Sequence, residues 1–353
     1  MRKRKLTVIG NIALGKPVHN GQTAKTRDYI HYLTNRYGKE FVNYLDTDNW
    51  KKKFLLKSLQ LIAVMIQSET LVLVLGSNGR KTILPLVALL KPIMKNKVLF
   101  SIVGGSLMYE FDKEKRTQKY MKMIDGNYVE TKQFLEFLRT KGIKNAYYSP
   151  VFSKRKGIKD LGVLEKTVSE PYYFCTYSRV CREKGTSNAI QAIINVNKEK
   201  GKLCCVLDIF GVPQDDYREE FEELVSNAKG AVRVFPYLTD ANAIETLSEH
   251  FMMLFPTYYS GEGFPIAIVE CFKAGVPVIA SNWHFNSEIV RNSKTGMIFE
   301  LNDVNALEKC IMYAIEHSDE ILKMKRNCIQ EAKLYEPDKA LQSIYKRIED
   351  KEV

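Results

Sequence analysis

The chain has 353 residues, of which 45% are hydrophobic and 27% are charged, and its formal net charge is +12 at pH 7. This length and composition predict a globular protein with room for two domains, and they exclude a disordered or fibrous chain. The longest apolar runs fall well short of the roughly 18 residues of a membrane span, so we expect neither a transmembrane helix nor a signal peptide. The seven cysteines form no Cys-x-x-Cys pair, which favours reduced thiols in a cytoplasm and predicts no zinc site.

The charge is unevenly distributed along the chain. Residues 1–168 hold 32 Lys and Arg against 13 Asp and Glu, a net charge of +19, whereas the remainder holds 21 against 28, a net charge of −7. Such an asymmetry indicates that the first half faces an anionic surface, either nucleic acid or anionic lipid. No signature of a nucleic-acid-binding module occurs, so no nucleic-acid partner is predicted.

Strand-like apolar runs alternate with helical stretches along the chain. In the first half, strands are predicted at 5–10, 41–45, 71–76, 98–103 and 146–148, and helices near 24–36, 51–67, 83–91 and 131–140. In the second half, strands are predicted at 172–177, 203–210, 232–236, 252–256 and 276–280, and helices near 187–198, 216–227, 241–250 and 265–274. This alternation predicts an α/β protein made of two Rossmann-like domains with parallel sheets. In such folds, ligands bind outside the carboxyl ends of the strands, so two facing domains would enclose a cleft.

The composition of the connecting segments sets the predicted domain boundaries. Residues 153–169 are basic and hold few aromatic side chains, which is typical of a linker. We therefore predict a first domain over 1–168, with the linker from about 153, and a second domain over 169–337. Residues 338–353 are predicted to form a charged amphipathic helix that crosses back to the first domain.

The segment KKKFLLKSLQLIAVMIQ, residues 51–67, admits two interpretations. A basic start followed by an apolar helix is the composition of a segment that lies in a membrane interface. The alternative, which the sequence favours, is a core helix packed on a sheet with a solvated basic end.

Two motifs resemble known phosphate or metal sites but depart from them. GNIALGKP, residues 10–17, is close to a Walker A sequence, but Pro17 replaces the Ser or Thr that would hold magnesium and lacks an amide proton. Asp46 and Asp48 resemble paired metal-binding aspartates, but no carboxylate partner can be assigned nearby, so a turn and helix cap is favoured. Neither an ATPase nor a metal site is predicted.

Two loops carry groups suited to phosphate. Residues 14–26 follow the first strand and precede a helix, and the turn at Asn20, Gly21 and Gln22 offers backbone amides at a helix start. The segment YSRVCREKG, residues 177–185, follows a strand and places Arg179 and Lys184 where two cations can bind a diphosphate.

The most informative segment is GEGFPIAIVECFKAGVPVIAS, residues 261–281. Glu262 lies between two glycines before a helix, and Glu270 lies inside a helix that is apolar on nearly every side. A buried carboxylate needs hydrogen-bond donors, which a ligand carrying hydroxyl groups can supply. The simpler alternative is a Glu262 that caps the helix and a Glu270 that reaches the surface.

Together, SRxxxxKG at Arg179 and Lys184 and the later GEGFP segment with Glu262 and Glu270 resemble the retaining glycosyltransferases of family 4, which have the two-domain GT-B fold. The resemblance spans most of the chain and also includes GSNGRKTILPLVALLK, FSIVGGSL and LDIFGVPQDDY, residues 76–91, 100–107 and 207–217. These segments look like members that act in bacterial surface-polysaccharide assembly, including O-antigen, lipopolysaccharide, capsule and exopolysaccharide synthesis.

The resemblance implies a role for each matching residue. Arg179 and Lys184 would bind the donor diphosphate, Glu270 would accept hydrogen bonds from the ribose hydroxyls, and Glu262, the expected catalytic residue, would meet the donor sugar. The backbone of Gly263 and Phe264 would surround the sugar and phosphate. The loop at Asn20, Gly21 and Gln22 and the turn at Gly104 and Gly105 would close over them from the first domain. Tyr237 and Leu238 lie where the family holds the base, although Tyr237 stands where a glycine is usual, and Val103 replaces a histidine that many members carry.

The resemblance also implies the chemistry and its setting. The donor would be a UDP-, GDP- or dTDP-sugar, no cofactor or metal would be required, and the configuration of the anomeric carbon would be retained. The acceptor would be a polyprenyl-diphosphate-linked saccharide, with the basic first domain docked on the anionic inner face of the cell membrane, so the protein would be cytoplasmic and peripheral. Two alternatives remain: a nucleotide-sugar epimerase or hydrolase on the same fold, and a non-catalytic GT-B partner subunit.

Overall fold

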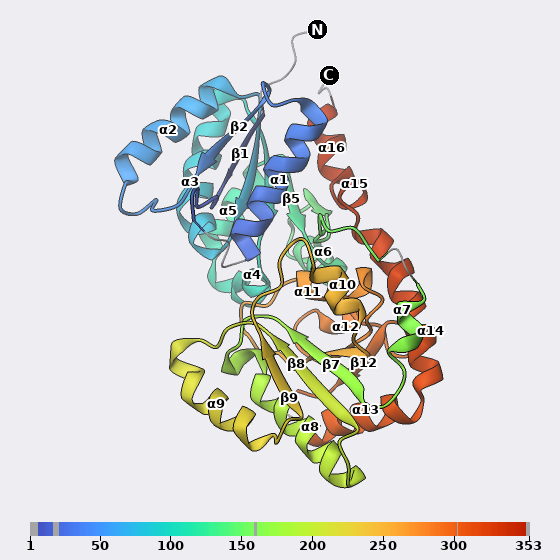
Figure 1. The fold of residues 1–353 in the computed structure, drawn as a ribbon. Helices are drawn as coiled ribbons and strands as arrows, with labels where there is room; N and C mark the ends of the chain where they lie inside the picture. The colour runs from blue at the N-terminus through green and yellow to red at the C-terminus, as the bar shows by residue number, and fades with distance from the viewer. Residues whose placement is uncertain (1–5, 17–20, 159–160, 302, 351–353) are drawn as a thin grey trace. The chain divides into compact units, whose positions relative to one another are not determined.

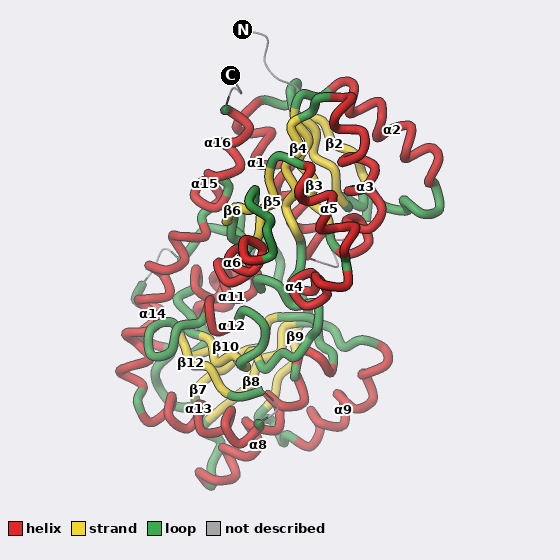
Figure 2. The backbone as a smooth tube through the Cα atoms, turned by 180° about the vertical axis from the view of Figure 1, so that it is seen from behind, coloured by secondary structure: helices red, strands yellow, loops and turns green. Residues whose placement is uncertain are grey.

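The fold is described from a computed structural model, which covers residues 6–16, 21–158, 161–301 and 303–350. The chain divides into two compact units. Unit 1 comprises residues 1–150 and 337–353, and unit 2 comprises residues 151–336. Each unit contains one six-stranded sheet in which all paired strands are parallel. Helices lie in front of the sheets in two opposite views (Figure 1, Figure 2).

The sheet of unit 1 has the strand order β2-β1-β3-β4-β5-β6. Its strands are β1 Leu6–Gly10, β2 Val42–Asp46, β3 Thr70–Leu75, β4 Lys97–Ile102, β5 Gly126–Val129 and β6 Ala146–Tyr148. Its helices are α1 Gly21–Tyr37, α2 Phe54–Gln67, α3 Ser77–Met94, α4 Ser106–Glu110, α5 Lys115–Met123, α6 Lys132–Thr140, α15 Pro337–Ala340 and α16 Gln342–Glu349. Every residue of β3 is buried, because a parallel strand inside such a sheet is covered on both faces.

The sheet of unit 2 has the strand order β12-β11-β10-β7-β8-β9. Its strands are β7 Tyr172–Tyr177, β8 Cys205–Phe210, β9 Val232–Phe235, β10 Met252–Phe255, β11 Val278–Ser281 and β12 Gly296–Phe299. Its helices are α7 Val163–Lys166, α8 Thr186–Lys200, α9 Arg218–Asn227, α10 Ala243–Ser248, α11 Ile266–Lys273, α12 Asn286–Ile289, α13 Val304–Glu316 and α14 Ser318–Ala332. Both units therefore have the Rossmann-like architecture predicted from the alternating pattern.

Several elements have no counterpart in the sequence-based prediction. These are β5, β12, α4, α5, α7, α12, α13 and α14. The two strands are only four residues long and each begins with glycine, Gly126 and Gly296, which weakens the β-propensity on which a prediction depends. Both strands form because they complete a ladder begun by a neighbouring strand.

The segment expected to be a linker is folded onto unit 2. Lys273 Nζ, on α11, donates to the backbone oxygens of Ser153 at 2.9 Å and Arg155 at 2.7 Å. Leu164, on the short helix α7, is also buried. Because these contacts join Ser153, Arg155 and Leu164 to unit 2, the boundary of the compact units follows residue 150 and differs from the expected boundary after residue 168.

The C-terminal segment belongs to unit 1. Ser149 Oγ donates to the Ala340 oxygen at 2.8 Å, and Arg36 on α1 pairs with Glu349 on α16 at 2.8 Å. The segment forms two short helices where one was expected.

Helix α2 is not the core helix that the sequence favoured. Only Leu61 and Met65, which are four residues apart, are buried in it. These two residues form a narrow stripe, Ile62 and Val64 are partly buried, and five large apolar side chains face solvent: Phe54, Leu55, Leu56, Leu59 and Ile66. The preference for a core helix was wrong because composition alone cannot tell an apolar helix that is buried all round from one that is buried along a single stripe. None of the helices described here is both long enough and apolar enough to cross a membrane.

Candidate active site

The strand order of unit 2 reverses between β7 and β10, which pair directly. In doubly wound sheets, ligands bind outside the carboxyl ends of the strands at such a point. The loop after β7 carries Arg179 and Lys184, and the loop after β10 carries Glu262. The topology therefore brings together two segments that lie about 80 residues apart in the sequence.

Lys184 and Glu262 form a buried ion pair at this point. Lys184 Nζ donates to Glu262 Oε2 at 2.5 Å, and each side chain is only 9% exposed. Thr257, just after β10, donates its hydroxyl to the same oxygen at 3.0 Å. Within the part of the chain that the structure describes, neither of these bonds reaches Glu262 Oε1 and no other side chain donates to it. Glu262 is thus held by one oxygen, which leaves the other able to accept from a ligand. Glu262 does not cap the helix through a side-chain bond.

Tyr259 lies beside both cations of the site. The Arg179 guanidinium carbon lies 4.8 Å and Lys184 Nζ lies 5.2 Å from the centre of the Tyr259 ring. A Cβ on Gly261 would come within 2.7 Å of this ring, so the first glycine of GEGFP makes room for it. No role was predicted for Tyr259 from the sequence, although the glycine two residues later was the available signal.

Gly185 fixes the backbone next to Lys184. It has φ of 71°, in the left-handed region, and a Cβ there would lie 2.1 Å from the Pro256 oxygen. Only glycine allows the loop after β7 to approach the end of β10 this closely. The Lys-Gly pair in SRxxxxKG therefore has a steric reason that is independent of any ligand.

Glu270 is buried, with 4% of the residue exposed, and does not reach the surface. Its donors come from the protein: Ser153 Oγ donates to Oε1 at 2.9 Å, and Arg155 Nη1 donates to Oε2 at 2.5 Å. The sequence predicted a ligand as the source of these donors and gave no role to Ser153 or Arg155, because both lie in the segment that was expected to be a linker. A carboxylate has about four acceptor positions, so acceptor capacity remains at Glu270.

Arg155 is itself held from several sides. Its Nη1 also donates to the Tyr177 hydroxyl at 2.5 Å, and its Nη2 donates to Asp240 at 2.9 Å. Burial alone would lower the pKa of Arg155, but the nearby Glu270 charge raises the pKa above its usual value. Burial, together with the same negative charge, raises the pKa of the Tyr177 hydroxyl. Arg155 is therefore a fixed cation and Tyr177 a neutral hydroxyl at neutral pH.

The remaining unit 2 candidates lie around the same strand ends. Gly263 and Phe264 directly precede Pro265, the N-cap of α11, and the Phe264 ring is buried against Tyr335 at 5.2 Å between ring centres. Only the backbone of Phe264 is therefore available to a ligand. Tyr237, which follows β9, is half exposed. Its Cε1 atom would lie 3.5 Å from a Cβ added to Gly211, the residue that follows β8. Leu238 next to it is half-buried.

The unit 1 candidates lie at the corresponding edge of their own sheet. The order of that sheet reverses between β1 and β3. Gly21 and Gln22 begin α1, and a Cβ on Gly76, after β3, would lie 2.9 Å from Gln22 Oε1. Gly104, with φ of 84°, and Gly105 follow β4. Asn20 lies outside the described residues.

A buried ion pair that was not predicted from the sequence lies at the same edge of unit 1. Lys25 Nζ on α1 lies 2.6 Å from Glu130, which follows β5, and donates to the Ile102 oxygen at 3.3 Å. Burial would lower the pKa of Lys25, but the Glu130 charge raises it overall. This pair fixes the first turns of α1 against the ends of β4 and β5.

The loop that resembles a Walker A sequence and the pair Asp46 and Asp48 contact each other. Asp46 accepts from the backbone amides of Ile12, Ala13, Leu14 and Asp48 at 2.9–3.3 Å. Burial opposes ionisation of Asp46, but these four bonds lower its pKa. Asp48 pairs with Lys16 at 2.6 Å. The aspartates thus organise the turn after β1, in agreement with the favoured interpretation as a turn.

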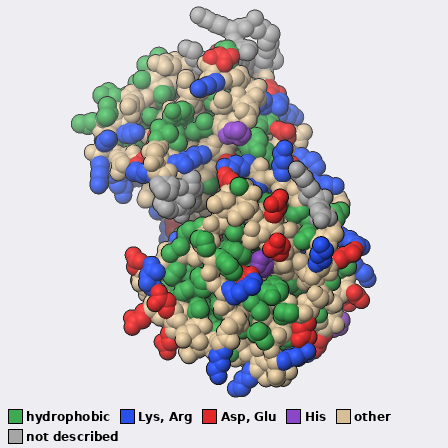
Figure 3. All heavy atoms as spheres, viewed as in Figure 1, with side chains coloured by type: hydrophobic (Ala, Val, Ile, Leu, Met, Phe, Trp, Pro, Cys, Tyr) green, Lys and Arg blue, Asp and Glu red, His purple; other side chains and the backbone are tan. Residues whose placement is uncertain are grey.

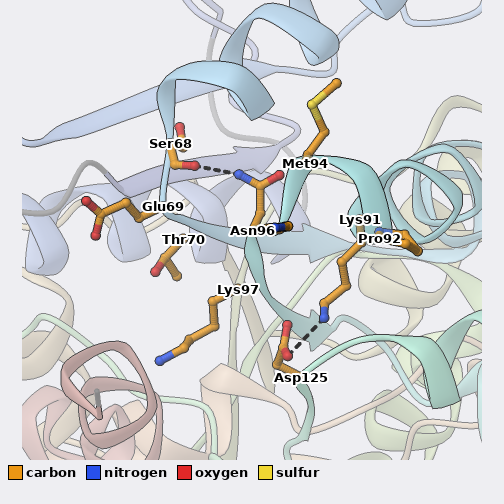
Figure 4. A pocket seen from close by; sticks show the side chains of 10 residues that line it. Ser68, Glu69, Thr70, Lys91, Pro92, Met94, Asn96, Lys97 and Asp125 are labelled. Carbon is orange, nitrogen blue, oxygen red and sulfur yellow. Dashed lines mark hydrogen bonds and ion pairs between the residues drawn. The ribbon is translucent and has the colours of Figure 1, made fainter. Parts of the chain in front are cut away.

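A pocket of about 600 Å³ in unit 1 lies at the opposite edge of the sheet (Figure 4). It is lined by residues at the starts of β3 and β4, among them Thr70 and Lys97, and by an ion pair of 3.1 Å between Lys91 and Asp125. Since it lies at the amino ends of the strands, it is separate from the candidate site residues of unit 1.

Both the sequence and the fold of this chain resemble known proteins. Residues 165–335 match the family model described as glycosyl transferases group 1. An Escherichia coli protein, UDP-Gal:alpha-D-GlcNAc-diphosphoundecaprenol alpha-1,3-galactosyltransferase, is 35% identical over 68 residues, which are 19% of this chain and 17% of the relative. The E. coli O-antigen chain mannosyltransferase B is 28% identical over 88 residues, which are 25% of this chain and 22% of that protein. The matches thus span less than a quarter of either curated relative.

Structural similarity extends over the whole chain. The crystal structure of Anabaena HepE in complex with UDP superposes with a TM-score of 0.72 at 13% identity, covering 98% of this chain and 99% of that one. At this identity the similarity shows the fold. Residues 165–335 therefore match the group 1 glycosyltransferases, in a chain whose two Rossmann-like units have the GT-B fold.

Proposed function

We propose that the protein is a retaining glycosyltransferase of family 4 that transfers a hexose from a nucleotide-diphosphate sugar to a hydroxyl of a lipid-linked saccharide. The observation that carries the proposal is the buried Lys184–Glu262 pair at the point where the strand order of unit 2 reverses. A buried charge pair costs desolvation energy, and it occupies the place where this type of fold binds its ligand.

In this proposal, positive charge at the site stabilises the departing diphosphate. Arg179 and Lys184 both lie beside the Tyr259 ring, so the two cations are near each other. Fixed cations that meet the charge developing on a leaving group lower the barrier to its departure. The acceptor hydroxyl attacks from the face that the phosphate leaves and gives its proton to that phosphate, so the configuration is retained without a protein nucleophile. No metal is required because the two side chains supply the charge.

Glu262 and Glu270 have different tasks in this scheme. Glu262 presents Oε1 to hydroxyls of the donor sugar, while Lys184 and Thr257 fix Oε2. Glu270 accepts from the ribose hydroxyls, in a geometry fixed by Ser153 and Arg155. The donor is a UDP-, GDP- or dTDP-sugar; the UDP bound to HepE favours UDP.

The proposed acceptor is a polyprenyl-diphosphate-linked saccharide in O-antigen, capsule or exopolysaccharide synthesis. The E. coli relatives support this class, since one is named for a diphosphoundecaprenol acceptor and the other for the O-antigen chain. A lipid-linked acceptor requires the enzyme to work at a membrane surface. We therefore propose a peripheral position on the inner face of the cell membrane, with the basic unit 1 toward anionic lipid.

The test uses the full-length protein, with chelator present, against a panel of UDP-, GDP- and dTDP-sugars. Thermal stabilisation and nucleotide release are measured together, with and without a lipid extract from bacterial membranes. We expect stabilisation by one donor class, and release of its nucleotide only when the extract is added.

The alternatives give different results. Nucleotide release or sugar conversion without acceptor identifies an epimerase or hydrolase. The absence of stabilisation by any donor favours a non-catalytic partner subunit. A requirement for added Mg²⁺ or Mn²⁺ contradicts the metal-independent mechanism.

A further inference from the structure

Helix α2 exposes an unusual number of large apolar side chains. Leu55 is 78% exposed, Leu59 66% and Ile66 69%, and Phe54 and Leu56 are about half exposed. Figure 3 shows hydrophobic side chains gathered over this helix. Single exposed apolar residues are common on protein surfaces, but a contiguous group indicates an interaction site.

Four of these exposed apolar residues lie toward one side of the helix. Leu55, Leu59 and Ile66 follow each other at intervals of four and seven residues, which places them on one side of an α-helix. The buried residues Leu61 and Met65 lie on another side. We call Leu55, Leu56, Leu59 and Ile66 the apolar face of α2, whereas Phe54, seven residues before Leu61, lies on the same side of the helix as that buried residue. Helix α2 is 14 residues long, or about 21 Å, so this face is long enough to lie flat on a surface.

The charged residues of α2 and of the three positions before it are all lysines. Lys51, Lys52 and Lys53 directly precede the helix and are exposed, and the helix itself contains Lys57 and no acidic residue. Lys57 Nζ donates to the Asp46 oxygen at 2.6 Å, which holds the start of the helix against the end of β2. The three exposed lysines therefore lie toward the carboxyl ends of the strands of unit 1, the edge that also carries Gly21 and Gly104.

A second helix of unit 1 adds to this surface. Asn96, just after α3, donates to the Met65 oxygen at 2.8 Å, so the ends of α2 and α3 lie together. Leu89 and Ile93, four residues apart on α3, are also exposed, Ile93 by 74%. Unit 1 thus exposes large apolar side chains on α3 as well as on α2.

We propose that the apolar face of α2 inserts into the interface of an anionic lipid bilayer, with Lys51, Lys52 and Lys53 at the lipid phosphates. A helix with an apolar face, adjacent lysines and no acidic residue has the charge and polarity of an interfacial helix. A protein partner of matching shape would need neither three adjacent lysines nor the absence of acids. The inference rests on the proposed function, which it deepens by naming the element that meets the membrane.

The experiment measures partitioning of the full-length protein onto vesicles by co-sedimentation, with no nucleotide sugar present. Vesicles of phosphatidylcholine alone are compared with vesicles that also contain phosphatidylglycerol. We expect binding that requires phosphatidylglycerol and weakens with added salt. The variant Leu55→Ser/Leu59→Ser/Ile66→Ser should lower the partition coefficient at least tenfold. The variant Lys51→Gln/Lys52→Gln/Lys53→Gln should remove most of the dependence on phosphatidylglycerol.

Unit 2 supplies matched controls. Leu161, Leu203 and Leu334 are each more than half exposed, and replacing all three by serine should leave partitioning unchanged. Lys198, Lys309 and Lys323 are exposed lysines whose replacement by glutamine should also have no effect. A Leu59→Trp variant tests insertion directly, because brominated lipid should quench its fluorescence well beyond that of the wild-type protein.

Three results would overturn the proposal: no binding to vesicles that contain phosphatidylglycerol, equal binding of the Leu55/Leu59/Ile66 variant, or a dimer in solution that this variant dissociates. The last result would assign the apolar face to a second copy of the chain. Vesicle binding needs neither donor nor catalysis, so it can fail while nucleotide release with a detergent-solubilised acceptor persists. Failure of the docking proposal is thereby distinguished from failure of the proposed function.

Discussion

Lys184 Nζ and Glu262 Oε2 lie 2.5 Å apart in unit 2, at the junction of the loops after β7 and β10. Both side chains are almost completely buried. Removing one partner of a buried pair leaves the other charged without compensation, which typically costs roughly 3–5 kcal/mol. This pair therefore links the stability of unit 2 to its proposed chemistry.

Glu262→Gln should lower the turnover number at least about a hundredfold, because removal of one group that interacts with the reacting centre typically has an effect of this size. The amide can still accept from Lys184, so the folded state should persist. Turnover is measured by nucleotide release at saturating donor, and folding by circular dichroism. Near-normal turnover would remove Glu262 from the site.

Lys184→Ala should both weaken binding of a nucleoside diphosphate and destabilise the protein, since it leaves Glu262 buried and unpaired. Calorimetric titration with UDP, GDP and dTDP measures the first effect and urea unfolding the second. The control is Glu316→Gln, which breaks a more exposed pair of 2.7 Å with Lys200 and should change neither. Unchanged diphosphate affinity in Lys184→Ala would contradict the proposed contact.

Arg155→Met should impair recognition of the ribose. Arg155 and Ser153 hold the two oxygens of Glu270, and without Arg155 this carboxylate loses its charge partner and its fixed orientation. We expect at least a tenfold rise in the dissociation constant of the preferred nucleoside diphosphate. The wild-type protein should discriminate against the 2′,3′-dideoxy analogue, and the variant should do so much less.

The neighbouring residue provides the control for Arg155. Lys154 pairs with the same Asp240 at 2.6 Å but is about half exposed, so Lys154→Met should keep both the affinity and the discrimination. If Arg155→Met discriminates between the two nucleotides as well as the wild-type protein does, Arg155 has only a structural role.

Gly185→Ala should destabilise unit 2 strongly, because the new Cβ would lie 2.1 Å from the Pro256 oxygen in addition to the strain of a positive φ. Gly201→Ala is the matched control: Gly201 has φ of 65° but no atom near its Cβ position. The control should lose about 1–2 kcal/mol from backbone strain alone. Gly185→Ala should lose roughly 1–3 kcal/mol more from the steric conflict. Equal losses in urea unfolding would mean that the backbone relaxes around the contact.

Lys325→Met should change how stability depends on pH. Lys325 is buried on α14 and donates to the His250 oxygen at 2.6 Å, and burial lowers its pKa from 10.5 to about 7. Between pH 7 and 10.5, the unfolded chain holds a proton at this side chain that the folded chain has lost. The free energy of unfolding therefore rises with pH over this range, by at most about 1.4 kcal/mol per pH unit from this residue.

The measurement compares urea unfolding at pH 7, 8 and 9 for the wild-type protein, Lys325→Met and Lys323→Met. The difference between wild type and Lys325→Met isolates Lys325, because the other titrating groups are common to both. Lys323 is exposed on the same helix, so its variant should follow the wild-type profile. Parallel profiles for wild type and Lys325→Met would contradict the lowered pKa.

The sequence by itself determined the architecture of both units. Apolar runs of strand length alternate with helical stretches, and burial on both faces leaves this signal in strands such as β3 and β10. Local chemistry also determined the end of α11, where Gly275 has φ of 70°, and the placement of Lys184 and Glu262 at strand ends. These features depend on short segments whose periodicity and turn residues act locally.

Only the tertiary structure decided which side chains meet. Arg155 and Glu270 lie 115 residues apart, and nothing in the periodicity of either segment indicates their contact. The sequence also did not determine which side chains of α2 are exposed, because an apolar helix is buried only where neighbouring elements cover it. Local propensity fixes the elements of this protein, whereas the order of the strands brings Lys184 to Glu262. The partners of Glu270 depend instead on the path of residues 151–158, which run along α11 without forming a strand.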